Sequence, residues 1–397
     1  METYAYFQMP QRVHYGRGTF EKVGEEVQKK GRKALIISDK VMEQIGNVSA
    51  CIDNLKSRQI DSEIYLGVES EPTDKYVEKA LSLFKEKACD VIVSIGGGSC
   101  IDTAKAVAVL ATNGGYIGDY MGGKKMASTD PIPHIAIPTT AGTGSEATDV
   151  TVIDNTSTHV KMMIKQPAFL PYAALVDPLL SKSSPKKVTA ATGVDALSHA
   201  IEAYISRLSH PMTDTMALSA MKRITANLLA AYENGDNIDA RENMSIGALQ
   251  AGIAFSNASV CLVHGMSRPI GALFGIPHGF SNAMLLPAVL EYSKDDCIHR
   301  LADLGRIFSE KAETMPDEEA ANVAVASVKE LCTKLNIPNL KTWGVDQEQF
   351  EKAIPKMAED AIDSGSPGNN PWSPTKEEIE NLYRVCYDYQ FETEQVK

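Results

Sequence analysis

The chain has 397 residues, with 39 Lys or Arg against 51 Asp or Glu, so its formal net charge is −12. This acidic balance argues against a protein that binds nucleic acids broadly, although a single local cation can still bind a small anionic substrate. The length is enough for two to three domains with sizeable cores, and the 44% hydrophobic content is ordinary for a soluble globular protein.

The cysteine pattern and the apolar runs indicate a cellular location. Seven cysteines are scattered without a Cys-x-x-Cys pair, which predicts reduced thiols. The N-terminal residues show no basic stretch followed by an apolar one, and no apolar run approaches the roughly 20 residues that span a bilayer. We therefore expect a soluble, cytoplasmic protein with no membrane or nucleic-acid partner.

The first half of the chain alternates helical and strand patterns. Residues 20–31 and 74–88 carry helical periodicity, while short β-branched apolar runs at 33–40, 90–98 and 134–140 predict strands. Strands and helices that alternate at this spacing form βαβ units, so we predict a Rossmann-like α/β domain with a parallel sheet over residues 1–185.

The pattern changes near residue 186. Long amphipathic or apolar segments follow with few alternating runs between them, which predicts an all-α domain over residues 186–397. A turn-rich segment at 364–374 precedes a closing helix at 377–389.

Two glycine-rich segments each follow a predicted strand. The first, Gly96-Gly97-Gly98-Ser99, leads into a predicted helix whose first amides could bind phosphate, but it matches neither G-x-G-x-x-G nor a P-loop. A second segment, 139–146, is rich in hydroxyls and glycines. Two such loops at strand ends favour a nucleotide over two plain turns.

Asp39 follows the strand predicted at 33–40, where a carboxylate can accept hydrogen bonds from a ribose 2′-hydroxyl. The same carboxylate would repel a 2′-phosphate, so we expect NAD in preference to NADP. The alternative is that Asp39 only caps the helix that follows it.

One aspartate and three histidines form a candidate metal site. Asp195 and His199 are four residues apart on one face of a predicted helix, whereas His264 and His278 are 14 residues apart. The segment between them carries residues that disfavour one continuous helix, so the chain can fold back there: Pro269, Gly271, Gly275 and Pro277. One carboxylate and three imidazoles can hold a divalent metal and leave a position for substrate. The alternative is a set of hydrogen-bonded core histidines.

Four motifs in this order resemble the iron-containing alcohol dehydrogenase family, which is related in fold to glycerol dehydrogenase and dehydroquinate synthase. They are GGGSCIDTAK, PTTAGTGSEAT, DALSHAIEAY and VHGMSRPIGALFGIPHG, and the resemblance runs from Gln8 to Tyr292 and fades beyond. It implies a dinucleotide-binding domain followed by a helical metal-binding domain. It also implies a homo-oligomer, dimeric or larger, and a metal that is usually Fe²⁺ and sometimes Zn²⁺.

The resemblance assigns roles residue by residue. The implied metal ligands are Asp195, His199, His264 and His278. The implied dinucleotide contacts are Asp39, Gly97, Gly98, Ser99, Thr139, Thr140, Thr143 and, near the nicotinamide ribose, Lys161.

The chain departs from the family pattern at Arg268. Many members carry a histidine four residues after the third metal ligand, where this chain has Arg268. A guanidinium stays charged and cannot shuttle a proton at neutral pH. Arg268 either pairs with a carboxylate of the protein or grips an anionic substrate tail such as a carboxylate, sulfonate or phosphonate.

The expected activity is reversible hydride transfer between NAD and a short-chain primary alcohol or aldehyde, with His278 and Arg268 as candidate catalytic residues. Phe255 and Phe274 are candidates for an apolar wall, with core packing as the alternative. Two other functions remain open: a dehydroquinate-synthase-like lyase that uses NAD and a metal, and a binding protein that retains the fold without catalysis.

Overall fold

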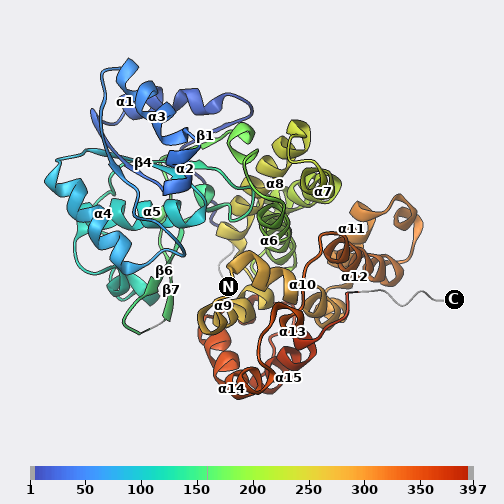
Figure 1. The fold of residues 1–397 in the computed structure, drawn as a ribbon. Coiled ribbons are helices and arrows are strands. Elements are labelled where there is room, and N and C mark those ends of the chain that lie inside the picture. The colour runs from blue at the N-terminus through green and yellow to red at the C-terminus, as the bar shows by residue number, and fades with distance from the viewer. Residues whose placement is uncertain (1–4, 159, 392–397) are drawn as a thin grey trace. The chain divides into compact units, whose positions relative to one another are not determined.

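The computed structural model describes residues 5–158 and 160–391 (Figure 1). These residues divide into two compact units, one over Gln8–Ser184 and one from Pro185 onward. The described residues before Gln8 belong with the second unit and not with the α/β unit where we expected them. The ring of Phe7 packs edge-on against His210, with centroids 6.1 Å apart, and the first strand begins only at Arg12.

The first unit contains a parallel sheet of six strands in the order β1-β8-β5-β4-β2-β3. The three predicted strands are confirmed with shorter ends, and three further short strands were not predicted. The strands are β1 (Arg12–Tyr15), β2 (Lys33–Ile37), β3 (Asp61–Tyr65), β4 (Val91–Gly96), β5 (His134–Pro138) and β8 (Ala173–Val176).

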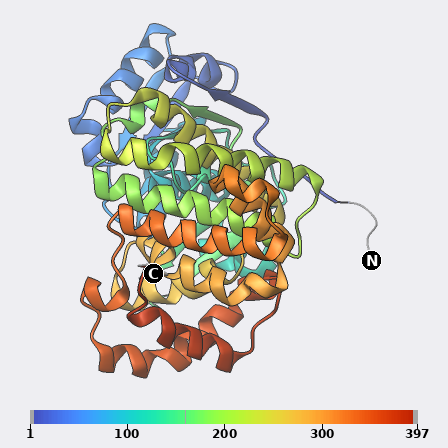
Figure 2. The ribbon, with the colours of Figure 1, turned by 90° about the vertical axis from the view of Figure 1, so that its right-hand side faces the viewer.

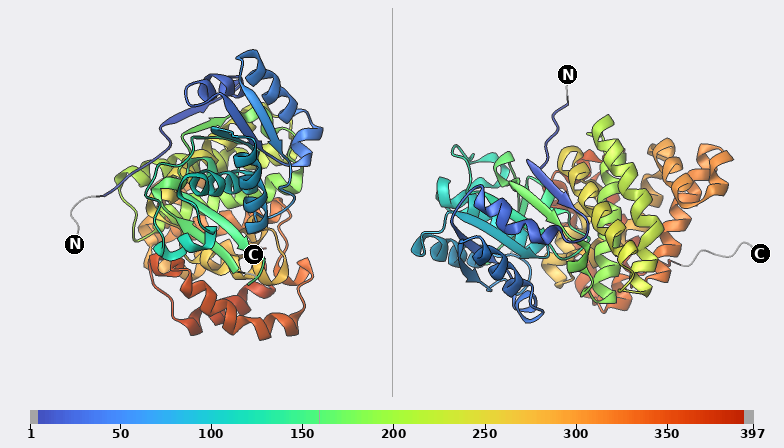
Figure 3. Two further views of the ribbon diagram at one scale, coloured as in Figure 1. Left: turned by 90° about the vertical axis from the view of Figure 1, so that its left-hand side faces the viewer. Right: turned by 90° about the horizontal axis from the view of Figure 1, so that it is seen from above.

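Helices cover both faces of this sheet (Figure 3). Successive residues of a strand point to opposite faces, so Ala34 and Ile36 of β2 pack with one helical layer and Leu35 and Ile37 with the other. The first layer consists of α1 (Val23–Gln28), α2 (Lys40–Gln44) and α3 (Asn47–Ser57), and the second of α4 (Asp74–Glu86) and α5 (Gly98–Asn113). The predicted helix at 20–31 is a 3₁₀ turn, Thr19–Lys22, followed by α1.

An antiparallel hairpin that was not predicted completes the unit. Its strands are β6 (Val150–Asn155) and β7 (Val160–Lys165), and α5 and α4 pack beside β6. Asp102 of α5 anchors the hairpin, because its carboxylate accepts from the backbone N–H of Val152 at 2.8 Å.

The second unit is helical, which confirms the α/β plus all-α fold class (Figure 2). Its longer helices are α6 (Lys186–Ile205), α7 (Pro211–Glu233), α8 (Ile238–Ala258), α9 (Leu262–Phe274), α10 (His278–Ser293), α11 (Ile298–Phe308), α12 (Asp317–Lys334), α14 (Gln347–Asp363) and α15 (Lys376–Tyr387). Helix α6 is buried along nearly its whole length, since α7, α8 and α10 all pack against it. Its side chains therefore lie in the interior of the unit.

The predicted break between His264 and His278 is confirmed, but it involves fewer residues than expected. Helix α9 ends at Gly275, whose φ of 64° is a left-handed conformation that favours glycine, and α10 begins after Pro277. Pro269 lies inside α9 and does not end it.

Within the described residues, no single helix is both long and apolar enough to span a membrane. Helices α8 and α9 meet that criterion only when taken together, across a bend of 102°.

Candidate functional site

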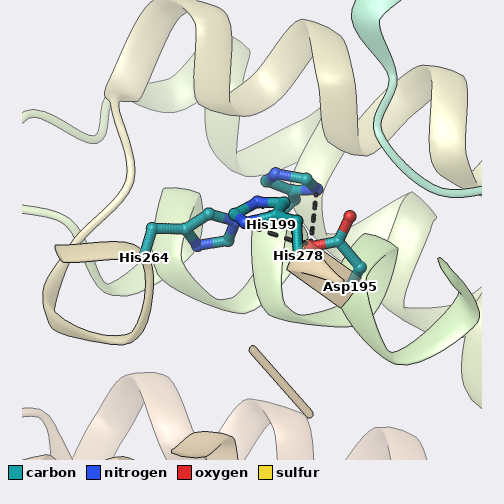
Figure 4. A group of neighbouring side chains, drawn as sticks. All are labelled: Asp195, His199, His264 and His278. Atoms are coloured by element: carbon teal, nitrogen blue, oxygen red, sulfur yellow. Dashed lines mark ion pairs between the residues drawn. The ribbon is translucent and has the colours of Figure 1, made fainter. Parts of the chain in front are cut away.

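The four predicted metal ligands meet at one point in the helical unit (Figure 4). Asp195 and His199 project from α6, while His264 comes from α9 and His278 is the first residue of α10. One ligand atom from each residue lies within 4.8 Å of the others. Asp195 Oδ1 lies 4.0 Å from His199 Nδ1, 3.6 Å from His264 Nε2 and 3.9 Å from His278 Nε2.

This cluster is buried except on one side. The side chains of Asp195, His199 and His264 are at most 5% exposed, whereas that of His278 is 29% exposed. Burial by itself would raise the pKa of Asp195, but the adjacent imidazoles and the contact with His264 hold that pKa below its usual value. The site thus offers an ionised carboxylate and imidazole nitrogens at one buried point.

Glu202 orients one of the imidazoles, and the sequence analysis did not identify it. Its buried carboxylate accepts from the His264 Nδ1–H at 2.5 Å and from the backbone N–H of Val263 at 2.6 Å. With Nδ1 bound to Glu202, His264 directs its other ring nitrogen, Nε2, toward Asp195 Oδ1 at 3.6 Å. The only sequence signal was its position on α6, three residues after His199.

Asn282 is a second residue that the sequence analysis missed. It lies on α10, four residues after His278, and is fully buried. Its Nδ2 lies 2.6 Å from Asp195 Oδ1, 3.0 Å from His264 Nε2 and 3.2 Å from His278 Nε2. The amide therefore contacts three of the four candidate ligand atoms.

These donors fit a divalent transition metal. Imidazole and carboxylate ligands suit both iron and zinc, and a protein carboxylate commonly orients such an imidazole from behind, as Glu202 does here. The convergence on Asp195 favours a metal centre over histidines that are satisfied separately in the core.

Arg268 does not form the carboxylate pair that was one of its two predicted roles. Its Nη1 donates to Ser366 Oγ at 2.8 Å, and within residues 5–158 and 160–391 it has no ion pair. Burial lowers the pKa of Arg268 to about 10, and the negative charge of Glu202 opposes this shift in part. Thus Arg268 lies in the electrostatic field of the residue that orients His264.

The two candidate phenylalanines have different surroundings. The ring of Phe255 stacks on His199, with centroids 4.2 Å apart and planes 16° apart. Phe274 instead packs against Phe350, with centroids 5.8 Å apart. The structure therefore supports an apolar wall at Phe255 and core packing at Phe274.

In the α/β unit the two glycine-rich loops lie against each other. Gly96 ends β4 with φ 153°, and its carbonyl accepts from the N–H of Thr139 at 3.0 Å. Gly98 begins α5, and a Cβ at this position would lie 2.8 Å from Thr143 Cγ2. Only a glycine at position 98 allows the start of α5 to lie this close to Thr143.

A buried charged network holds the two loops together. Lys105 of α5 donates from Nζ to Ser145 Oγ at 2.9 Å, Thr148 Oγ1 at 2.8 Å and the carbonyl of Val150 at 2.7 Å. Ser145 in turn donates to Asp102 of α5. The segment after β5 is thereby bound to α5, the helix that follows β4.

The predicted dinucleotide contacts differ in how accessible they are. Partly exposed residues border the loop surface: Asp39, Gly97, Gly98, Ser99, Thr140 and Thr143. Thr139 is buried. Asp39 caps α2 by accepting from the N–H of Met42 at 2.9 Å, and its Oδ2 faces the glycine turn, 3.4 Å from where a Cβ of Gly96 would be. Asp39 therefore caps α2 and also lies beside the glycine turn, so its two predicted roles do not exclude each other.

Lys161 lies on β7 and pairs with Glu71 at 3.0 Å. None of its hydrogen bonds or ion pairs within the described part of the chain reaches the two loops. Its contact with the nicotinamide ribose therefore stays a prediction, and in this structure its ammonium pairs with Glu71.

Comparisons with known proteins match almost the whole chain. A family profile described as iron-containing alcohol dehydrogenase matches residues 10–178, and one for the C-terminal part of the Fe-containing alcohol dehydrogenase family matches residues 189–387. The resemblance therefore continues well past Tyr292, where we expected it to fade. The chain is 38% identical to a 1,3-propanediol dehydrogenase of Citrobacter freundii, over 94% of this chain and 96% of that protein.

Solved structures agree with these matches. The crystal structure of a 1,3-propanediol oxidoreductase superposes with a TM-score of 0.93 at 36% identity, covering 97% of this chain and all of that one. A sulfoacetaldehyde reductase of Bifidobacterium kashiwanohense, solved in complex with NAD⁺, superposes with a TM-score of 0.87 at 26% identity, covering 98% of this chain and all of that one. The family motifs, the fold and these matches agree: the chain belongs to the iron-containing alcohol dehydrogenase family, with its dehydroquinate synthase-like fold.

Proposed function

We propose that this protein catalyses reversible hydride transfer between NAD and a short-chain primary alcohol or aldehyde, at a metal centre held by Asp195, His199, His264 and His278. The observation that carries the proposal is the convergence of these four ligand atoms within 4.8 Å in a chain of this family. Fe²⁺ is the proposed metal, with Zn²⁺ as the alternative. When bound, such an ion acts as a Lewis acid on the alcohol or carbonyl oxygen.

The residues around the centre set its polarity and its open side. Asp195 supplies the one charged ligand, and Glu202 keeps His264 in the tautomer that can bind a metal. His278 has the most exposed side chain of the four, so we place the entry of the alcohol beside it. Phe255 closes the cluster behind His199 and limits the access of water from that side.

The two loops of the α/β unit are the proposed site for the cofactor. The first amides of α5, at Gly98 and Ser99, and the hydroxyls of Thr140 and Thr143 can bind the pyrophosphate, and Gly97 leaves room for close approach. Asp39 beside this surface can bind the ribose hydroxyls, which favours NAD over NADP.

Two residues of the predicted set have a more limited role. Thr139 is buried, so we propose that it supports the loop through its backbone bond to Gly96. Lys161 is kept as a contact to the nicotinamide ribose, for which it must exchange its partner Glu71. The NAD⁺ complex of the related sulfoacetaldehyde reductase supports this choice of cofactor.

The proposal is tested by NADH consumption with short aldehydes, using protein reloaded with Fe²⁺ or Zn²⁺. We expect turnover by the wild type and a loss of about 100-fold or more in Asp195→Asn and His264→Ala, because each removes a ligand. An alcohol and NAD⁺ should give steady accumulation of NADH, which a lyase that regenerates its NAD would not show. Metal-loaded wild type without turnover of any aldehyde would instead support a binding protein.

Arg268 favours a narrower substrate class, an aldehyde with an anionic tail. The observation behind this candidate is a mostly buried guanidinium whose hydrogen bond, within the described residues, goes to the neutral Ser366. If Arg268 grips such a tail, Arg268→Ala lowers kcat/KM for anionic aldehydes by at least about 10-fold more than for neutral ones. An equal loss for both classes rejects this narrower candidate and leaves the general one in place.

We also propose a cytoplasmic homo-oligomer, dimeric or larger. The location is supported by the seven cysteines, which are all free and buried. The oligomer rests on the family resemblance, and sedimentation of the purified protein tests it.

A further inference from the structure

Lys161 is held by an ion pair that its proposed contact with the cofactor would have to break. Its Nζ lies 3.0 Å from Glu71 Oε2, and the lysine side chain is 9% exposed whereas that of Glu71 is 44% exposed. An ammonium with so little access to water is costly to leave unpaired. A lysine that leaves Glu71 for the cofactor therefore needs another anionic partner within its reach.

Asp154 is the carboxylate that faces Lys161 across the hairpin. It lies on β6 directly opposite Lys161 on β7 in the register of the two strands. Its backbone N–H donates to the carbonyl of Pro72 at 2.7 Å and not to the partner strand. Directly opposite residues without mutual backbone hydrogen bonds have the closest side chains in an antiparallel pair, and these point to the same face.

The carboxylate of Asp154 is incompletely bonded. Its Oδ1 is buried and has no hydrogen-bond partner among the described residues. Burial raises the pKa of Asp154, the charge of Lys161 opposes that rise, and the charges of Glu71 and Asp74 add to it. This carboxylate therefore lacks the direct cationic partner that Lys161 could become.

Two contacts connect this ion pair with the proposed cofactor surface. Asp102 of α5, the helix whose first amides are the proposed pyrophosphate site, accepts a backbone N–H of β6 at 2.8 Å. In the segment between β3 and α4 that carries Glu71, Glu69 pairs at 2.9 Å with Lys40, the residue that follows Asp39. The hairpin and this segment thus both contact elements that carry the proposed cofactor residues.

We infer that Lys161 has two alternative partners: Glu71 holds its ammonium in the free protein, and Asp154 holds it when the dinucleotide is bound. This inference rests on the proposed function, in which Lys161 contacts the nicotinamide ribose. Asp154 then pairs with the charge of Lys161 through an oxygen that has no other partner, while the remaining N–H groups of the ammonium can donate to ribose hydroxyls. Glu71 returns to water at little cost, because its carboxylate is already partly exposed. Asp154 is thus a positioning residue, and Glu71 competes with the cofactor for Lys161.

The experiment measures the dissociation constant of NADH by calorimetry, with full-length protein reloaded with Zn²⁺. The variants Glu71→Gln and Asp154→Asn each remove one negative charge and keep the size of the side chain. Both are also made in a Lys161→Met background, which lacks the ammonium. Glu63→Gln is the matched control, because Glu63 of β3 forms a partly exposed ion pair with Lys33 at 3.2 Å.

If the inference is correct, the two substitutions change NADH affinity in opposite directions. Glu71→Gln tightens binding about 3- to 5-fold, because it removes the partner that the cofactor must displace. Asp154→Asn weakens binding about 10-fold, because the ammonium has no charged partner in the complex. In the Lys161→Met background neither substitution changes the affinity by more than about 1.5-fold. Glu63→Gln binds NADH as the wild type does.

Three results would overturn the inference. They are an unchanged or weaker affinity in Glu71→Gln, an unchanged or tighter affinity in Asp154→Asn, and effects of the same size with and without Lys161. If the wild type binds NADH and Lys161→Met binds it equally well, this inference fails while the proposed cofactor stands. If the wild type does not bind NADH, the proposed function fails and the inference fails with it. Thermal unfolding shows which variants are folded, and Asp154→Thr, whose side chain suits a strand, takes the place of Asp154→Asn if that variant is not.

Discussion

Replacement of Glu202 by glutamine tests how the protein selects the metal-binding tautomer of His264. The carboxylate accepts two short hydrogen bonds, from His264 Nδ1 at 2.5 Å and from the N–H of Val263 at 2.6 Å. Glutamine has one oxygen and one NH₂, so one of these buried donors loses its acceptor. Hydrogen bonds to charged groups contribute about 1.5–3 kcal/mol, and an unsatisfied buried donor costs a similar amount.

This cost appears in metal binding because the tautomer of His264 is coupled to it. If the glutamine NH₂ faces Nδ1, the imidazole carries its proton on Nε2 and that nitrogen cannot bind a metal until the tautomer is restored. At 1.4 kcal/mol per tenfold change, about 1.5–3 kcal/mol corresponds to a loss of roughly 10- to 100-fold in affinity. Glu202→Gln also removes the negative charge next to Arg268, which lowers the stability of the metal-free protein.

The assay is a chelator-competition titration of metal-free Glu202→Gln with Co²⁺, followed by thermal unfolding with and without the ion. Glu291→Gln is the control, since Glu291 lies on α10 and pairs with Lys329 and Tyr389 at the surface. An unchanged Co²⁺ dissociation constant in Glu202→Gln would refute the reasoning, because the proton on Nδ1 would then be held by something other than this carboxylate.

Three further substitutions address the cofactor loops and the pH dependence of stability. Asp39→Ser keeps a cap for the N–H of Met42 but removes the negative charge. The ratio of kcat/KM for NADPH to kcat/KM for NADH should therefore rise about 10-fold. An unchanged ratio means that Asp39 only caps the helix. Gly98→Ala places a Cβ 2.8 Å from Thr143 Cγ2 and should weaken NADH binding about 10-fold, as measured by calorimetry. An affinity equal to that of the wild type would contradict this prediction. Burial raises the pKa of Glu146 from 4.5 to about 7, so between these two pH values the folded protein holds a proton that the unfolded chain has released. The free energy of unfolding therefore falls by about 3 kcal/mol as pH rises from about 4.5 through 7. Urea unfolding of Glu146→Gln at pH 5 and pH 8 should show this loss removed, and a pH dependence equal to that of the wild type would assign it to other groups.

Two of the missed strands of the sheet, β1 and β3, differ from the predicted strands in how they are buried, whereas the missed strand β8 is buried like them but is only four residues long. Strands β2, β4 and β5 are buried on both faces, and such strands are nearly continuous apolar runs that the sequence reveals directly. Strands β1 and β3 are the two edges of the sheet and carry exposed polar residues. Short, partly exposed edge strands lack a distinctive periodicity, so their pairing follows from the sheet that they join.

The candidate metal centre shows the same division between local pattern and tertiary contact. The four-residue spacing of Asp195 and His199 predicted that they share a helix face, and the glycine and proline content before His278 predicted the chain reversal. Glu202 and Asn282 also lie within one helical turn of a ligand. Neither was identified, because a glutamate or an asparagine on a helix is ordinary until its partner is known.

The sequence by itself determined the parallel α/β half, the helical half and the four side chains that can bind a metal, since these depend on periodicity and on residue type. Only the tertiary structure decided that Glu202 binds His264 Nδ1, that Asn282 lies among the ligand atoms, and that Arg268 donates to Ser366. The physical reason is that these contacts depend on the distance between two atoms and on their alignment, which a sequence pattern does not contain. Periodicity places a residue on a face of a helix, whereas a hydrogen bond requires two atoms about 3 Å apart and aligned, which only the packing of helices distant in the chain can bring about.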